Sequence, residues 1–291
     1  MPSGGAEGGA RHAAWRNGRG AWRTLKEWEA LLVKSRFRAV TAPFDCRTPR
    51  DVTDALLEIC ARRDVMIAEI GVWKNLFDPD PARAAEALAY AKGQLALADE
   101  AGIPCCVNIA GTASAAGWDA ADRSNFTDET YGRIVDSVRE ILDSVRPRRA
   151  YYCLEPMPWM VPDSPEGYLQ LIHDVDRPGF GAHMDFVNMI NCPRRCLAPE
   201  AFIEQCFSTL SGHIKSTHIK DTRLHPTNLT ALIQECAPGE GTLDYEAVLR
   251  IMDRHLPADA PMLLEHMTTF EAYAAAYDYV SAAAARAGIA V

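Results

Sequence analysis

The chain has 291 residues, of which 48% are hydrophobic, and a formal net charge of −9 at pH 7. This length allows a single domain with one large hydrophobic core. The acidic balance argues against nucleic acid as a partner, because phosphate binding needs clustered cations. No apolar run reaches the ~18 residues of a membrane span, and no secretory signal opens the chain. The nine cysteines follow no zinc-ribbon spacing, so we expect reduced thiols in a cytoplasmic protein without membrane contact.

Residues 1–23 are rich in glycine and arginine and contain a single acid, Glu7. They offer so little apolar surface that we expect a basic N-terminal arm. The remaining residues, 24–291, are expected to form a single domain. No clear strand precedes the helix that begins near Thr24, so the first strand of the predicted fold is poorly defined.

Apolar runs of strand length alternate with helical patterns from residue 24 onward. The strand-like runs are residues 37–41, 65–70, 105–109, 151–155, 181–185, 214–218 and 261–265. The segments before and between them carry apolar residues at helical spacing, as at Leu25, Trp28 and Leu32 before the first run. Strands that alternate with helices predict a parallel sheet covered by helices. The predicted fold class is therefore α/β, and the length favours a (β/α)8 TIM barrel.

Four of the predicted strands end on a side chain that can bind a metal. Glu155, Asp185, His218 and Glu265 each precede a loop signal, at intervals of 30, 33 and 47 residues. A barrel of roughly 250 residues repeats about every 31 residues, so we interpret these positions as successive strand tips, with a long loop before the last. The tips point into one mouth, where three carboxylates and an imidazole would carry a charge of about −3 and require a divalent cation. The donor set favours Mn²⁺, with Mg²⁺, Co²⁺ or Zn²⁺ as alternatives.

The motifs around these four positions resemble a known family. They are Glu155-Pro-Met-Pro-Trp159, His183-Met-Asp185-Phe-Val-Asn188, His218-Ile-Lys-Asp221, Pro238-Gly-Glu-Gly241 and Leu264-Glu265. Together they resemble the xylose isomerase-like TIM barrels, and within these the sugar phosphate isomerase/epimerase group that includes the ketose 3-epimerases, over residues 37–285. The resemblance implies that the four strand-tip residues are the metal ligands. It also implies that Glu69 and Asn108 line the same mouth.

Two positions depart from the ketose 3-epimerase pattern. That family carries a Glu six residues after its first metal-ligand Glu and a His three residues after its metal-ligand Asp, and both contact the sugar. Here these positions are Val161 and Asn188. The metal ligands are kept while the residues that contact the sugar hydroxyls differ. Relatives with this metal site carry out eliminations or decarboxylations, so the resemblance also implies a lyase as an alternative.

Aromatic and histidine side chains near the expected mouth are further candidates for substrate binding. Trp73 and Trp159 lie in mouth loops, where an indole can stack on a sugar ring or serve only in loop packing. Regular strand alternation makes His183 point inward with Asp185, either as a base or as a core histidine. By the same alternation, His266 is expected to face outward, away from the site.

Two cations follow the His218 strand. Lys220 and Arg223 could bind a phosphate or carboxylate of the substrate. Lys220 could equally pair with the neighbouring Asp221. The sequence leaves open whether the substrate is phosphorylated.

These observations favour a divalent-metal-dependent sugar isomerase or epimerase. The cation would chelate a carbonyl and a neighbouring hydroxyl and stabilise an enediolate, while Glu155 and Glu265 remove and return the proton. The alternative is a metal-dependent lyase that acts on a 3-oxo sugar or glycoside by elimination, C-glycoside cleavage or decarboxylation. An endonuclease IV-like enzyme would need more histidine ligands and a basic face, and a non-catalytic barrel subunit would not need all four ligands. The expected partner is a small carbohydrate, and the sequence is compatible with a homo-oligomer or a hetero-oligomer.

Overall fold

The strands form one parallel sheet of seven, in the order β1-β2-β3-β4-β5-β6-β9. In the computed structural model, which describes residues 24–290, the bounds are β1 Ala39–Thr41, β2 Met66–Gly71, β3 Cys105–Asn108, β4 Tyr151–Leu154, β5 Phe180–Met184, β6 Ile214–Ile219 and β9 Met262–Leu264. Each of the seven predicted strands is found, with ends within two residues of the predicted ones. The expectations of a basic arm and a first strand fall on residues 1–23, which lie outside the described residues.

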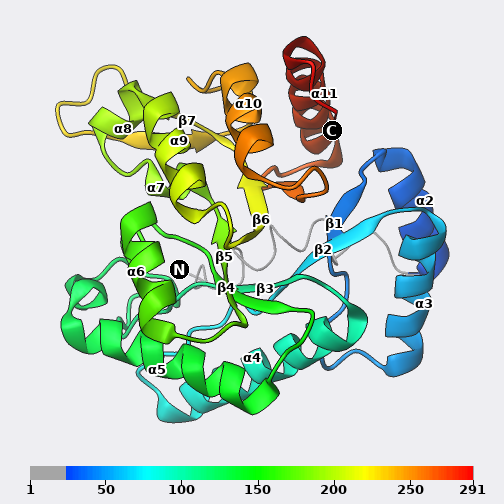
Figure 1. The fold of residues 1–291 in the computed structure, drawn as a ribbon, viewed down its shortest axis with the longest axis vertical. Coiled ribbons are helices and arrows are strands. Elements are labelled where there is room, and N and C mark those ends of the chain that lie inside the picture. Colours follow the sequence, from blue (N-terminus) through cyan, green and yellow to red (C-terminus); the bar gives the residue numbers. More distant parts are fainter. Residues whose placement is uncertain (1–23, 291) are drawn as a thin grey trace.

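The sheet curves into a nearly closed barrel (Figure 1). Every neighbouring pair of its strands is parallel. The two edge strands, β1 and β9, lie close to each other. This arrangement confirms the predicted TIM barrel, and it directs the carboxyl ends of all seven strands toward the same mouth.

Helices alternate with the strands and cover the outside of the sheet (Figure 1). They are α2 Leu25–Ser35, α3 Arg50–Arg62, α4 Pro81–Ala101, α5 Asp128–Val145, α6 Pro165–Val175, α9 Pro199–Leu210, α10 Tyr245–His255 and α11 Phe270–Ala287. Local sequence sets several of the starts. Asp80 caps α4 just before a proline, and Thr127 caps α5 by accepting a hydrogen bond from the Thr130 amide. None of the described helices is long and apolar enough to cross a membrane.

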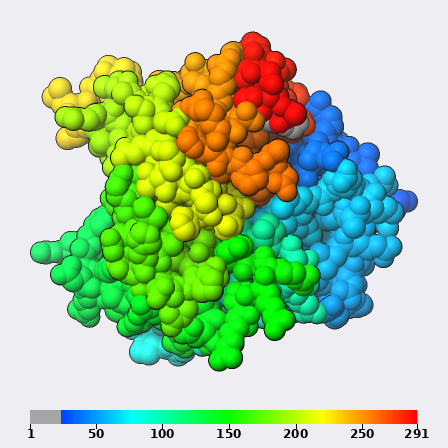
Figure 2. All heavy atoms as spheres, viewed as in Figure 1, coloured from blue at the N-terminus to red at the C-terminus, as the bar shows by residue number. Residues whose placement is uncertain are grey.

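Short elements follow the carboxyl ends of several strands and build the rim of the mouth. They are the 3-10 helix η2 Arg123–Phe126, the helices α7 Phe186–Met189 and α8 Pro193–Leu197, and an antiparallel hairpin of β7 Asp221–Leu224 and β8 Ile233–Cys236. The hairpin accounts for the long interval between the last two strand tips, where the sequence predicted only a loop. Its tip projects at the upper left of the molecule (Figure 2).

The hairpin is anchored to the barrel by Asp221. Its carboxylate accepts hydrogen bonds from the backbone amides of Gly239, Gly241 and Leu243, at 3.1 Å each. A side chain at Gly241 would collide with this carboxylate, which explains the glycine there. The carboxylate of Asp221 therefore bonds the backbone that follows the hairpin.

Candidate metal centre and its cavity

The structure brings the four strand-tip residues together. Glu155, Asp185, His218 and Glu265 each offer one ligand atom, and these atoms lie within 4.8 Å of one another. Nδ1 of His218 lies 3.2 Å from Oε1 of Glu155, 3.0 Å from Oε2 of Glu265 and 3.9 Å from Oδ2 of Asp185. All four side chains are buried. Three carboxylates and an imidazole nitrogen form a donor set that fits a divalent cation such as Mn²⁺ or Mg²⁺.

A buried lysine offsets part of the negative charge of this cluster. Nζ of Lys220 lies 2.7 Å from Asp185, 2.8 Å from Glu265 and 3.0 Å from Glu235. Burial alone would lower the pKa of Lys220, but these carboxylates raise it well above its usual value, so the amine stays charged. Lys220 therefore offsets part of the expected charge of about −3, and the negative charge that remains suits a divalent cation. Lys220 pairs with these carboxylates and not with its neighbour in sequence.

Crowding of carboxylates changes the titration of Glu155. Burial, together with the nearby Glu265, raises the pKa of Glu155 to about 8. In the absence of a cation, Glu155 therefore binds a proton at neutral pH. A cation that takes this carboxylate as a ligand must displace the proton first.

The affinity for a divalent cation should therefore depend on pH. Below the raised pKa of Glu155, each lost pH unit should weaken binding at least tenfold, so Mn²⁺ affinity should rise between about pH 6 and pH 8. Titration calorimetry in buffers of different ionisation enthalpy should detect proton release on binding. An affinity that stays constant across this range, without proton release, would contradict the assignment of Glu155 as a ligand.

A second group of polar side chains lies beneath the cluster and orients His218. Nε2 of His218 lies 3.3 Å from Oε1 of Glu69, and the Ser216 hydroxyl donates to Oε2 of Glu69 at 3.0 Å. His183 packs edge-on against His218, with ring centroids 4.1 Å apart, and its Nδ1 lies 3.4 Å from Glu69. Burial alone would lower the pKa of His218, but Glu265, Glu69 and Glu155 raise it well above its usual value, so the metal-free imidazole is protonated on both nitrogens. When a cation displaces the proton on Nδ1, Glu69 can accept the proton on Nε2 and so direct the lone pair of Nδ1 at the carboxylate cluster. Glu69 was predicted to line the mouth, but it is fully buried below it.

Replacing Glu69 by Gln should weaken metal binding without removing a ligand. We expect a loss of about 10- to 100-fold in Mn²⁺ affinity, the usual effect of removing a carboxylate partner of a ligating histidine. Calorimetric titration would measure this loss, and circular dichroism would verify the fold. Unchanged affinity in the folded variant would show that Glu69 does not orient His218.

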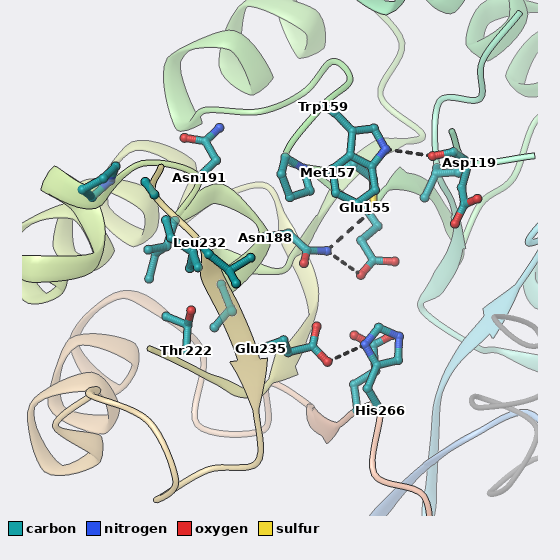
Figure 3. Close-up of a pocket in the computed structure, with 18 of the residues that line it drawn as sticks. Asp119, Glu155, Met157, Trp159, Asn188, Asn191, Thr222, Leu232, Glu235 and His266 are labelled. Carbon is teal, nitrogen blue, oxygen red and sulfur yellow. Dashed lines mark hydrogen bonds and ion pairs between the residues drawn. The ribbon is translucent and has the colours of Figure 1, made fainter. Parts of the chain in front are cut away.

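A cavity of about 560 Å³ opens above the cluster. Glu155 and Glu265 lie at its base, whereas Asp185 and His218 are not among its lining residues. The walls include three indoles, those of Trp73, Trp118 and Trp159. In Figure 3, Trp159 and Met157 lie on one side of Glu155, and the Glu235–His266 pair lies on the other.

Two residues of the cavity have a backbone conformation that is rare for bulky side chains. Trp73 has φ 48° and His266 has φ 61°. The other described non-glycine residues with positive φ lie at helix ends or in a turn. A left-handed non-glycine residue costs about 1–3 kcal/mol and is typical of functional sites.

The expectation that His266 faces away from the site is wrong. Its left-handed backbone breaks the strand alternation after Glu265, so the imidazole lines the cavity. Nδ1 of His266 lies 2.7 Å from Glu235, and its Nε2 lies 3.3 Å from Oε1 of Glu265. The hairpin supplies Glu235, so it contributes directly to the site.

The other predicted contact residues divide between the cavity and the protein interior. Asn188 lines the cavity, and its Nδ2 donates to Oε1 of Glu155 at 3.3 Å. Asn108 is fully buried, where its side-chain amide bonds the backbone of Lys74. Arg223 is exposed on β7, and only its neighbour Thr222 lines the cavity. His183, Lys220 and Asn108 therefore act beneath the cavity wall and not on its surface.

A family model for the xylose isomerase-like TIM barrel matches residues 30–283. The chain belongs to this family. No curated protein sequence matches it.

Several solved structures resemble this protein at low sequence identity. One is a protein from Mycobacterium smegmatis in complex with magnesium, with 15% identity, a TM-score of 0.65, and coverage of 91% of this chain and 90% of that chain. A second is 3-keto-D-glucoside 4-epimerase from E. coli, with 14% identity, a TM-score of 0.66, and coverage of 90% and 95%. A third is a probable 3-DHS dehydratase from Bacillus anthracis, with 15% identity, a TM-score of 0.66, and coverage of 90% and 95%. At these identities the likeness shows a common fold, on which several chemistries occur.

Proposed function

We propose that the protein is a divalent-metal-dependent sugar isomerase or epimerase that acts on a ketose or a related carbohydrate through an enediolate. The observation that carries this proposal is the convergence of three buried carboxylates on Nδ1 of His218 at the base of a cavity. The residues that would hold the cation are Glu155, Asp185, His218 and Glu265, with Mn²⁺ or Mg²⁺ as the expected ion. When bound, the cation supplies a Lewis acid that polarises a substrate carbonyl and stabilises the enediolate.

Glu155 and Glu265 are proposed to transfer the proton. Of the four cluster residues, only these two line the cavity, so they are placed to reach a substrate carbon. Asn188 holds Glu155 by donating to its Oε1. Lys220 holds Oε2 of Glu265, while Oε1 of the same carboxylate faces His266. A proton removed by one carboxylate and returned by the other inverts the carbon, and return to the neighbouring carbon isomerises the sugar.

A metal-dependent lyase is the second candidate. It would use the same proton removal but expel a leaving group from the adjacent carbon. Val161 and Asn188 at the positions where ketose 3-epimerases carry sugar contacts favour it, as does the likeness to a probable dehydratase. The small-molecule partner is a carbohydrate under either candidate.

Isotope exchange distinguishes the two candidates. Mn²⁺-loaded protein would be incubated in D₂O with a panel of ketoses and 3-oxo glycosides. We expect deuterium at one carbon of an intact, recovered sugar. Release of an aglycone, water or CO₂ would contradict the isomerase or epimerase and support the lyase. Absence of any reaction in the metal-bound protein would contradict both candidate functions.

A further inference from the structure

The walls of the cavity are more apolar than recognition of a free sugar requires. Above the two glutamates, three indoles and the side chains of Met157 and Leu232 form much of the lining. At about 560 Å³, the cavity is in the ~300–1,000 Å³ range of pockets that hold drug-sized ligands. A free sugar presents mostly hydroxyls, so most of this apolar surface would have no matching partner.

The charge of the cavity disfavours an anionic substrate. Four carboxylates, those of Asp119, Glu155, Glu235 and Glu265, line it. Among the lining residues of the described chain there is no lysine or arginine. Lys220 lies behind the wall and is held by three carboxylates. A phosphate or uronate would therefore meet four carboxylates and no lysine or arginine, while the imidazole of His266 is already paired with Glu235.

The aromatic wall is held in place before any ligand binds. Nε1 of Trp159 donates to the backbone carbonyl of Asp119 at 2.7 Å. Nδ2 of the buried Asn125 bonds the carbonyls of Ala120 and Trp159, at 3.0 and 3.1 Å, and so ties together the loops that carry Trp118 and Trp159. A flat group could thus bind the wall without first ordering these loops.

We propose that the substrate is an uncharged sugar that carries both a keto group and an aromatic substituent, with the carbonyl and its neighbouring carbon over Glu155 and Glu265 and the aromatic ring against Trp118 and Trp159. This inference rests on the proposed function, because that function places the sugar above the metal centre. It narrows the substrate class to aromatic glycosides that carry a keto group on the sugar and to aromatic conjugates of ketoses, and it excludes sugar phosphates.

Equilibrium binding tests this proposal independently of turnover. Mn²⁺-loaded protein would be titrated by calorimetry with phenyl glycosides of glucose, galactose and xylose, with the free sugars, and with glucose 6-phosphate. We expect at least one phenyl glycoside to bind about tenfold or more tightly than its free sugar. We expect glucose 6-phosphate to bind no more tightly than glucose. A phosphate ester that binds more tightly than every phenyl glycoside, or free sugars that bind as well as their glycosides, would overturn the proposal.

Variants of Trp159 locate the aromatic site. Trp159→Ala should lose most of the extra affinity that the phenyl group provides, while its affinity for the free sugar stays within about twofold of the wild type. Trp159→Phe should keep the extra affinity for the phenyl glycoside. An equal loss of affinity for the glycoside and for the free sugar in the alanine variant would overturn the placement of the aromatic ring against Trp159. Tight binding of the phenyl glycosides, together with no proton exchange on ketoses or on 3-oxo phenyl glycosides, would leave this inference standing and refute the proposed function. Proton exchange on free ketoses, together with phenyl glycosides that bind no more tightly than the free sugars, would refute this inference and leave the proposed function standing.

Discussion

Replacing Glu155 by Gln should reduce proton exchange at the substrate carbon by about 10³-fold or more. The change removes a negative ligand and, at the same position, one of the two carboxylates placed to transfer the proton, an interaction usually worth 10²–10⁴ in rate. The amide keeps the size of the side chain, and Asn188 can still bond its oxygen. The measurement is the rate of deuterium incorporation from D₂O at saturating Mn²⁺, with the fold checked by circular dichroism.

Glu58→Gln provides the matched control, because Glu58 is exposed on α3, outside the barrel. It should exchange at the wild-type rate. Full exchange activity in Glu155→Gln would remove Glu155 from the mechanism. Loss of activity in both variants would show that the assay reports general damage.

Replacing Lys220 by Met should destabilise the metal-free protein by about 3–5 kcal/mol, the usual cost of breaking a buried ion pair. Lys220 is fully buried between Asp185, Glu265 and Glu235, so its loss leaves their negative charges facing one another. A bound cation should restore much of this loss. The increase in Tm on adding Mn²⁺ should therefore be larger in the variant than in the wild type, as thermal unfolding with and without Mn²⁺ would show.

Lys92→Met is the control, since Lys92 forms an ion pair with Glu140 on the outer helices. An isolated pair of this kind contributes about 0–1 kcal/mol, so its Tm should barely change. Equal stability of Lys220→Met and wild type in the metal-free state would contradict a charged Lys220. A metal-induced increase in Tm no larger than that of the wild type would contradict its role in balancing the cluster.

The sequence predicted the barrel and its cluster because both depend on repeated local patterns. Each strand is a short apolar run followed by a loop signal. The carboxyl ends of parallel barrel strands lie at the same mouth, independently of the conformation of the loops. The positions of Glu155, Asp185, His218 and Glu265 follow from that topology alone, and the structure places them together. Their binding of a metal stays a prediction.

The surroundings of the cluster could not be predicted in the same way, because they depend on loop conformation and long-range packing. Lys220 lies two residues after His218, so strand alternation indicates that both side chains point inward. The carboxylates that pair with Lys220 are distant in sequence and are brought to it only by the folded barrel. His266 enters the cavity through a left-handed backbone that strand alternation does not predict. Trp118 and Glu235 come from a loop and a hairpin whose sequences carry no motif.

Anomalous X-ray diffraction from crystals loaded with Mn²⁺ would locate the bound ion. We expect one Mn²⁺ peak inside the barrel mouth, coordinated by Glu155, Asp185, His218 and Glu265 and absent from crystals of an Asp185→Asn variant. Crystals with no peak at this position, or with a peak bound by other side chains, would contradict the proposed metal centre.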